Sequence, residues 1–298
     1  MQSRCIAPLT VLPSDRIFRR RLKDGKVSLG KDGKVSLGSE FSCYKRGAKR
    51  HLTMRLAAIS DLHYNRDSRG KYEDLFRAIS DSADLLLLCG DLTDYGLQEE
   101  AEILAEDLRA YVHVPILGVL GNHDFESGKP EKVRKTMIDA GAKILDGESV
   151  EIDGIGFAGA CGFAGGFDQW ALNPWGEAIY KEFVQAAVNE ALKLETALSR
   201  LQNDVRIVLL HYSPIRATVI GESPEIFPFL GSSRLEDPLN HYGVSAAFHG
   251  HAHKGAPEGS TSKDVPIFNV SIPVLKRHRP DDPPFLLYDV DAGTPVRS

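Results

Sequence analysis

Five short apolar runs in this chain each end at side chains that commonly bind metals. Such runs, bounded by glycine and polar residues, are typical of buried strands. Proteins that alternate strands with helices gather their ligands beyond the carboxyl ends of the strands. We therefore expect the five ends to converge on one metal centre. In chain order they are Asp61-Leu62-His63, Gly90-Asp91, Gly121-Asn122-His123-Asp124, His211 and His249-Gly250-His251-Ala252-His253.

The residue types and their spacing indicate which ions would bind. Side chains two residues apart on an extended segment point the same way, which pairs Asp61 with His63 and His251 with His253. Carboxylate, amide and imidazole ligands without cysteine suit divalent Mn, Fe or Zn. The set exceeds the needs of one tetrahedral ion, whereas a carboxylate shared between two ions would use all of it. Each motif alone is typical of a turn or cap, but the five together favour a metal site.

In this order, the five motifs resemble the signature of the calcineurin-like metallophosphoesterases, within their phosphodiesterase-like branch. They span residues 61–253. The resemblance implies two divalent metal ions with Asp91 as the bridging ligand. One ion would be held by Asp61, His63, Asp91 and His253, and the other by Asp91, Asn122, His211 and His251.

The same resemblance implies a mechanism. A hydroxide between the ions would attack phosphorus in line, with His123 near the leaving group and Asp94 orienting His123. Two cations suit this chemistry because they neutralise an anionic ester, activate water and stabilise the developing charge. Adjacent side chains diverge, so His123 is free to act as an acid if Asn122 binds metal. We assign His249, Asp124 and His113 to supporting or surface positions.

The leading functional hypothesis is hydrolysis of a small-molecule phosphate ester, with a phosphodiester preferred. One alternative is a protein serine/threonine phosphatase. Those enzymes resemble this chain in the metal motifs but carry arginines at the positions of Tyr95 and Leu120, which count against that reading. A second alternative is a non-catalytic metal-binding scaffold, although such members lose ligands that this chain keeps. Purple acid phosphatases are disfavoured because their tyrosine ligand would fall at Asp94.

Charge divides the 298-residue chain into two parts. Residues 1–53 carry 13 Lys or Arg against 4 acids, whereas residues 54–298 carry 23 against 37, a net charge of −14. An acidic catalytic region argues against a polynucleotide substrate. Lys23 to Gly30 is repeated without change as residues 31–38. This unit of eight residues is shorter than solenoid repeats and occurs twice, whereas solenoids need at least three copies. We therefore expect residues 1–53 to be a basic extension outside the fold and 54–298 to be the metallophosphoesterase domain.

Composition narrows the cellular setting. No apolar stretch approaches the ~20 residues that a membrane helix needs. The four cysteines have no paired spacing, and Cys89 and Cys161 lie in apolar, strand-like contexts. Such usage is typical of buried free thiols in a reducing cytoplasm. The sequence does not indicate an oligomeric state.

The periodicity after each motif predicts an α/β fold that opens strand, helix, strand, helix, strand. A hairpin is expected around Asp153-Gly154, then a long helix from about Glu177 to Leu201. Residues 265–270 and 285–290 are expected to be late antiparallel strands. The glycine-rich, aromatic segment 162–170 either closes over the metals or packs on the fold. With these elements, the family resemblance implies a four-layer α/β/β/α sandwich of two mixed sheets flanked by helices.

Overall fold

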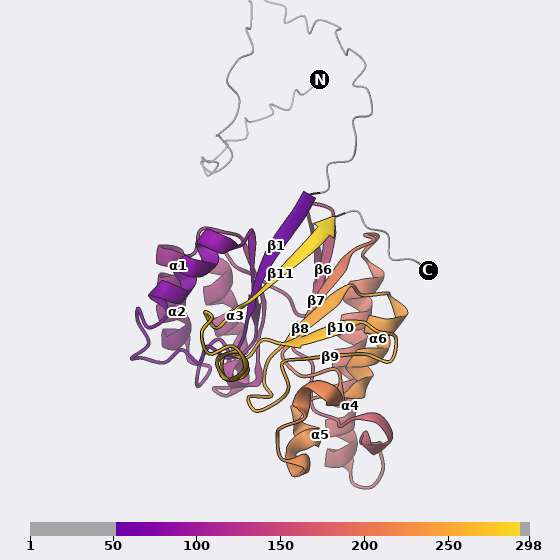
Figure 1. The fold of residues 1–298 in the computed structure, drawn as a ribbon. Coiled ribbons are helices and arrows are strands. Elements are labelled where there is room, and N and C mark those ends of the chain that lie inside the picture. Colours follow the sequence, from indigo (N-terminus) through magenta and orange to yellow (C-terminus); the bar gives the residue numbers. More distant parts are fainter. Residues whose placement is uncertain (1–51, 293–298) are drawn as a thin grey trace, which may run out of the picture. The chain divides into compact units, whose positions relative to one another are not determined.

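The computed structural model describes residues 52–292, which form two β-sheets with helices outside them (Figure 1). The first sheet has the order β11 (Leu286–Ala292), β1 (Leu52–Ile59), β2 (Leu85–Cys89), β3 (Ile116–Val119), β4 (Lys143–Ile144). The second has the order β5 (Glu148–Ile152), β6 (Ile155–Gly159), β7 (Arg206–Leu209), β8 (Ala246–His249), β10 (Pro266–Asn269), β9 (Glu258–Ser260). Both sheets are mixed: β1–β11, β5–β6 and β9–β10 pair antiparallel, and the other neighbours pair parallel.

Helices cover the outer face of each sheet (Figure 1). The first sheet is covered by α1 (Glu73–Ser82), α2 (Gln98–Tyr111) and α3 (Pro130–Asp139). The second is covered by α4 (Ala178–Ser199) and α6 (Glu236–His241). Shorter pieces complete the described residues: α5 (Phe227–Leu230), α7 (Ile272–His278), and the 3-10 turns η1 (Asn122–Phe125), η2 (Asp168–Trp170), η3 (Arg216–Val219), η4 (Pro224–Ile226) and η5 (Ser233–Leu235). The expected four-layer α/β/β/α sandwich is confirmed.

Alternation along the central strands creates the layers. In β2, Leu86 and Leu88 join the core under α1, α2 and α3, whereas Leu85 and Leu87 face the second sheet. In β7, Val208 faces α4 while its neighbours face inward. Both faces of these strands are buried, so their sequences are continuous apolar runs. Burial of each such leucine contributes about 1.5–3 kcal/mol.

The sequence-based expectations for the central elements hold. The chain opens β1-α1-β2-α2-β3, and the hairpin β5–β6 turns at Asp153 and Gly154, which both have positive φ. The long helix is α4. The expectation of two antiparallel tail strands was only partly correct: β11 is antiparallel to β1, but β10 lies in the other sheet and is parallel to β8.

The expected domain boundary after residue 53 falls inside a strand. β1 begins at Leu52, and Thr53 pairs with Asp291 of β11 and donates its hydroxyl to that carboxylate over 2.6 Å. Most of the predicted basic extension, residues 1–51, lies outside the described residues. We keep the two-part division as a proposal, with its boundary moved to the start of β1.

We predict that residues 1–51 are dispensable for folding and turnover. A chain that begins at Leu52 should melt cooperatively and keep its activity, because β1 and its pairing with β11 are intact. A chain that begins at Met54 should also fold but be less stable by about 1 kcal/mol, since it loses ladder and hydroxyl hydrogen bonds. Thermal melts and steady-state rates of both proteins test this. Insolubility or inactivity of the longer of the two would show that the extension belongs to the fold.

Candidate metal centre

The five motifs lie at the carboxyl ends of β1, β2, β3, β7 and β8. β1, β2 and β3 are parallel neighbours in one sheet, and β7 and β8 are parallel neighbours in the other. The loops that follow are joined across the sheets. The His251 amide donates to the Asp61 carboxylate of the other sheet over 3.1 Å, while within the second sheet the Gly250 amide donates to the His211 carbonyl over 3.1 Å. Each sheet therefore supplies part of one shared centre.

The backbone at the centre is held in an unusual conformation. Asp61, His63, Asp91 and His251 all have φ between 45° and 67°, the left-handed region that side chains other than glycine seldom occupy. Such residues cost energy and cluster at functional sites. Gly121 is required for a different reason: a Cβ there would overlap the Asp91 side chain and come within 2.8 Å of the His211 ring. The motif spacing therefore reflects tight backbone packing as well as ligand chemistry.

The first cluster contains Asp61, His63 and His253. The Nε2 atom of His253 lies 2.8 Å from Asp61 Oδ1, and His63 Nε2 lies 4.0 Å from the same oxygen. His63 Nε2 is buried without any hydrogen-bond partner. A buried polar atom without a partner is costly, so a group that this nitrogen could bind is expected nearby.

The second cluster contains Asp91, His211 and His251, with Asn122 beside them. The buried His211 has its Nδ1 3.0 Å from the Cys89 carbonyl, to which Nδ1–H donates, leaving Nε2 as an acceptor. That Nε2 lies 2.9 Å from Asn122 Oδ1 and 3.3 Å from Asp91 Oδ1. Three acceptor atoms thus face one another, which is the environment that a bound cation satisfies.

Asp91 is a member of the second cluster and also forms a third group with His63 and His123, which overlaps the first cluster at His63. Its Oδ1 faces His211, and its Oδ2 lies 3.7 Å from His63 Nε2. The backbone amide of His123 also donates to Asp91 Oδ1 over 2.9 Å, which fixes the carboxylate. The residues therefore fit two cations that share Asp91.

Oxygen atoms that contact the second ring nitrogen of His251 and of His63 fix the orientation of these imidazoles. His251 Nε2–H donates to the Phe229 carbonyl over 3.2 Å, and His63 Nδ1 lies 3.4 Å from the Asp94 carboxylate. Histidines that bind metals commonly donate their other ring N–H to a carbonyl or carboxylate in this way. The role of Phe229 was missed from the sequence because a backbone carbonyl can belong to any residue type.

Asp94 contacts His123 through its main chain, and its carboxylate faces a different histidine. His123 Nδ1–H donates to the backbone carbonyl of Asp94 over 2.7 Å, while the Asp94 carboxylate faces His63. The His123 ring packs edge-on against His63 with centroids 4.5 Å apart, and its side chain is 34% exposed. Asp94 thus orients His123 through its main chain and His63 through its side chain.

The supporting residues occupy distinct positions. Asp124 is buried and accepts hydrogen bonds from the amides of Thr93 (2.9 Å) and Gly121 (2.8 Å), which ties the second motif to the third. His249 is buried and bonded to Thr218 Oγ1 over 2.8 Å, and it is a member of neither cluster. His113 is exposed on the surface. None of these three belongs to a cluster within residues 52–292.

A family model for calcineurin-like phosphoesterases matches residues 54–255. The chain belongs to the calcineurin-like phosphoesterase family. Phosphopantetheinyl hydrolase (PptH) from Mycobacterium tuberculosis has a similar fold, with a TM-score of 0.58 and 15% identity over 78% of this chain and 95% of that chain. The protein TT1561 of Thermus thermophilus matches with a TM-score of 0.47 and 12% identity, over 81% of this chain and 100% of that one. No curated protein shows significant sequence similarity.

Family membership and the His/Asp clusters make this calcineurin-like phosphoesterase a metal-dependent phosphoric ester hydrolase. Its helices in residues 52–292 are all too short or too polar to cross a membrane.

Burial sets the protonation of the centre. It raises the pKa of Asp91 to about 9, with a further contribution from the charge of Asp61. Burial also lowers the pKa of His211 to about 3, together with repulsion from His251. Burial likewise lowers the pKa of His63 and His251, so these rings are neutral and able to bind metal. Burial opposes ionisation of Asp61 too, but the hydrogen bond from His253 and the charges of His211 and His253 together outweigh it and hold that pKa below its usual range.

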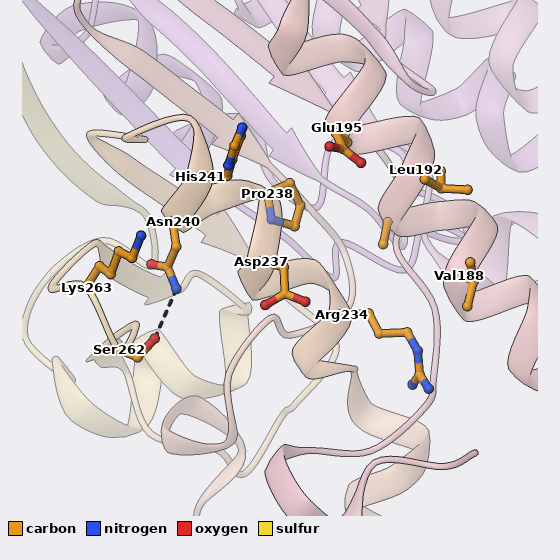
Figure 2. Close-up of a pocket in the computed structure, with 11 residues that line it drawn as sticks. Val188, Leu192, Glu195, Arg234, Asp237, Pro238, Asn240, His241, Ser262 and Lys263 are labelled. Atoms are coloured by element: carbon orange, nitrogen blue, oxygen red, sulfur yellow. Dashed lines mark hydrogen bonds between the residues drawn. The ribbon is translucent and has the colours of Figure 1, made fainter.

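Two clefts lie on either side of α4. One, of about 430 Å³, reaches Asn122 and Tyr212 at the metal centre. The other, of about 640 Å³, lies between α4 and α6 (Figure 2). Its lining includes Val188, Glu195 and Arg234 but none of the proposed ligands, and Asn240 bonds Ser262 across it over 3.1 Å. Only the first of these two clefts adjoins the reaction centre.

We predict that metal binding releases about one proton per chain at about pH 7.5, because metal ligands must be deprotonated. The main group is Asp91, which with a pKa of about 9 is protonated in the metal-free protein at that pH. His253, whose pKa is raised by its hydrogen bond to Asp61, can add to the release, whereas His63, His211 and His251 carry no proton to lose. Apparent affinity should therefore rise with pH up to about 9 and then level off. Calorimetric titrations in buffers with different ionisation enthalpies measure the release. Buffer-independent heats at neutral pH would contradict it.

Proposed function

We propose that this enzyme hydrolyses a small phosphodiester with two divalent ions held by the seven predicted ligands. The observation that carries the proposal is the position of Asp91. Its two carboxylate oxygens face two separate clusters of histidine and carboxylate groups, as a bridging ligand would. The ligands are Asp61, His63, Asp91, Asn122, His211, His251 and His253.

The ions would supply charge neutralisation and a water of lowered pKa, and Mn, Fe and Zn all suit the ligand set. The protein's own residues prepare the rest. Asp91 is held by the His123 amide. The bond from His123 Nδ1–H to the Asp94 carbonyl leaves His123 Nε2 to carry a proton to the departing oxygen. Asp94 is a positioning residue in this scheme.

The preference for diesters rests on two positions beside the motifs. Where protein phosphatases carry arginines, this chain has Tyr95, which is 55% exposed, and Leu120, which is packed in the core under α1, α2 and α3. Neither side chain can neutralise the second negative charge of a phosphomonoester. A monoester that is hydrolysed faster than diesters with each of Mn, Fe and Zn would overturn the preference and favour the phosphatase alternative.

We also propose that the enzyme works in the cytoplasm, where its free thiols Cys89 and Cys161 stay reduced. Cell fractionation that recovers it in an oxidising compartment would contradict this.

Elemental analysis should find two transition ions per chain. Asp91→Ala should lose both, because one carboxylate serves both clusters, whereas His251→Ala should lose mainly the ion on the His211 side. Circular dichroism and melting curves of each variant establish that the fold is retained. One ion per active wild-type chain, or an Asp91→Ala protein that keeps two, would rule out the bridged centre.

The role of His123 predicts a dependence on the leaving group. His123→Ala should lose ~10²–10⁴-fold in rate on an alkyl diester, the usual contribution of a general acid. The loss should be clearly smaller for a nitrophenyl diester, whose leaving group needs no proton, and the metal content should not change.

A matched control for this variant is His113→Ala, which removes an exposed imidazole outside both clusters and should leave both rates unaltered. Equal losses on the two esters in His123→Ala would instead assign His123 to substrate binding, and loss of metal would make it structural.

A further inference from the structure

The cleft beside Asn122 is built for an organic group. Its walls combine apolar and aromatic side chains with a few polar ones, and they come from η1, the segment after β6, α4 and the residue after His211. Its volume of about 430 Å³ exceeds that of a single ring. The apolar walls are Phe125, Cys161, Phe163, Ala186 and Tyr212, and the polar positions are Asn122, Asn189, Glu190 and Lys193.

Contacts with the metal centre fix these walls. The ring of Tyr212 is buried and lies 4.5 Å from the ring of His251. Phe163 packs at 5.9 Å from Tyr212 and at 5.1 Å from Phe183 of α4. A group bound in the cleft would therefore contact side chains that are rigidly placed relative to the metal ligands.

The charges in the cleft favour an uncharged occupant. Glu190 accepts a hydrogen bond from the Gly162 amide over 3.1 Å and lies 2.7 Å from the Lys193 ammonium. Lys193 is also paired with Asp146 at 2.9 Å. Asp146 does not line the cleft, so the lining carries one carboxylate and one ammonium, and the ammonium is already paired with two acids. A second anionic group on the substrate would therefore lose its hydration there without gaining an unpaired cation.

The cleft and His123 lie on different sides of Asp91. The Asn122 side chain turns to His211, 2.9 Å away, whereas the His123 ring packs on His63. Tyr212 and Cys161 extend the cleft on the His211 side: the Cys161 carbonyl accepts from the His211 amide over 2.9 Å. A group in the cleft is therefore placed away from the acid that serves the leaving oxygen.

We propose that this cleft binds the ester substituent that stays on phosphorus, and that it selects an uncharged, ring-containing group. The inference rests on the proposed diesterase function. In the balanced reaction, the oxygen of water forms a bond to phosphorus and the P–O bond to the other, smaller alcohol breaks. That alcohol takes its proton through His123. The ring-bearing group remains in the monoester product. The other proton of the attacking water is lost to solvent.

Benzyl methyl phosphate tests the assignment because its two alcohols are similar in acidity. The wild-type enzyme should form methanol and benzyl phosphate in preference to benzyl alcohol and methyl phosphate by at least ~10-fold. That is the usual discrimination between substrates that do and do not fill a small apolar pocket. Phosphorus NMR of the products gives the ratio directly. A methyl 4-carboxybenzyl diester should be cleaved more slowly, because the cleft offers its carboxylate no unpaired cation.

Two matched variants on α4 locate the effect. Ala186→Leu fills the cleft and should bring the product ratio towards one while turnover of methyl nitrophenyl phosphate is kept. Ala191→Leu makes the same change on the cleft of Figure 2 and should keep the wild-type ratio. Melting curves verify that both proteins are folded. The product ratio from benzyl methyl phosphate and the rate on the 4-carboxybenzyl diester are measured on the wild-type enzyme. They therefore decide the proposal even if a substitution destabilises the helix.

The outcomes separate this proposal from the function on which it rests. Release of benzyl alcohol, or a ratio of one in the wild type, would overturn the cleft assignment while the diesterase function stands. A ratio that Ala186→Leu does not alter would do the same. Failure to cleave any diester, methyl nitrophenyl phosphate included, would overturn both.

Discussion

Two carboxylates, Asp61 and Asp91, are buried within one small volume, and their mutual repulsion is the constraint on which the site depends. Burial and the charge of Asp61 together raise the pKa of Asp91 to about 9, and the surrounding imidazoles are mostly neutral, so within the described residues few positive charges are available to offset the pair. Buried charges persist only when paired or bound to metals. The left-handed backbone at Asp61 and Asp91 adds a further cost. Without cations the pair avoids this repulsion by keeping a proton on Asp91, and bound cations would take the place of that proton.

Convergence of the ligands could be predicted because it follows from strand direction. Parallel strands that end at the same edge bring residues such as Asp91 and Asn122 together whatever the details of their helices. Burial on both faces made β2 and β7 recognisable as continuous apolar runs. By contrast β4 and β9, with 2 and 3 residues, are too short to show any periodicity.

Other features could not be predicted because they depend on the main chain or on non-motif residues. The carbonyls of Asp94, Cys89 and Phe229 orient imidazoles, and no side-chain pattern marks a carbonyl. The cleft beside Asn122 is another example. Its lining from α4 has the ordinary spacing of an amphipathic helix, and only the packing of that helix beside Tyr212 gives those residues a place near the centre. Phe163, in the glycine-rich segment, packs on the fold and also lines this cleft.

The division of ligands between the two sheets has a mechanical consequence. One sheet provides Asp61 and Asp91 and the other provides His211 and His253, and the contact between Asp61 and His253 joins residues 192 positions apart. Ions bound there would cross-link the two sheets and would close a loop that contains most of the domain. Such closure restricts the unfolded chain, although the gain grows only with the logarithm of loop length. Metal occupancy would thus be coupled to the docking of one sheet on the other, so that the same ions would serve both catalysis and the stability of the sandwich.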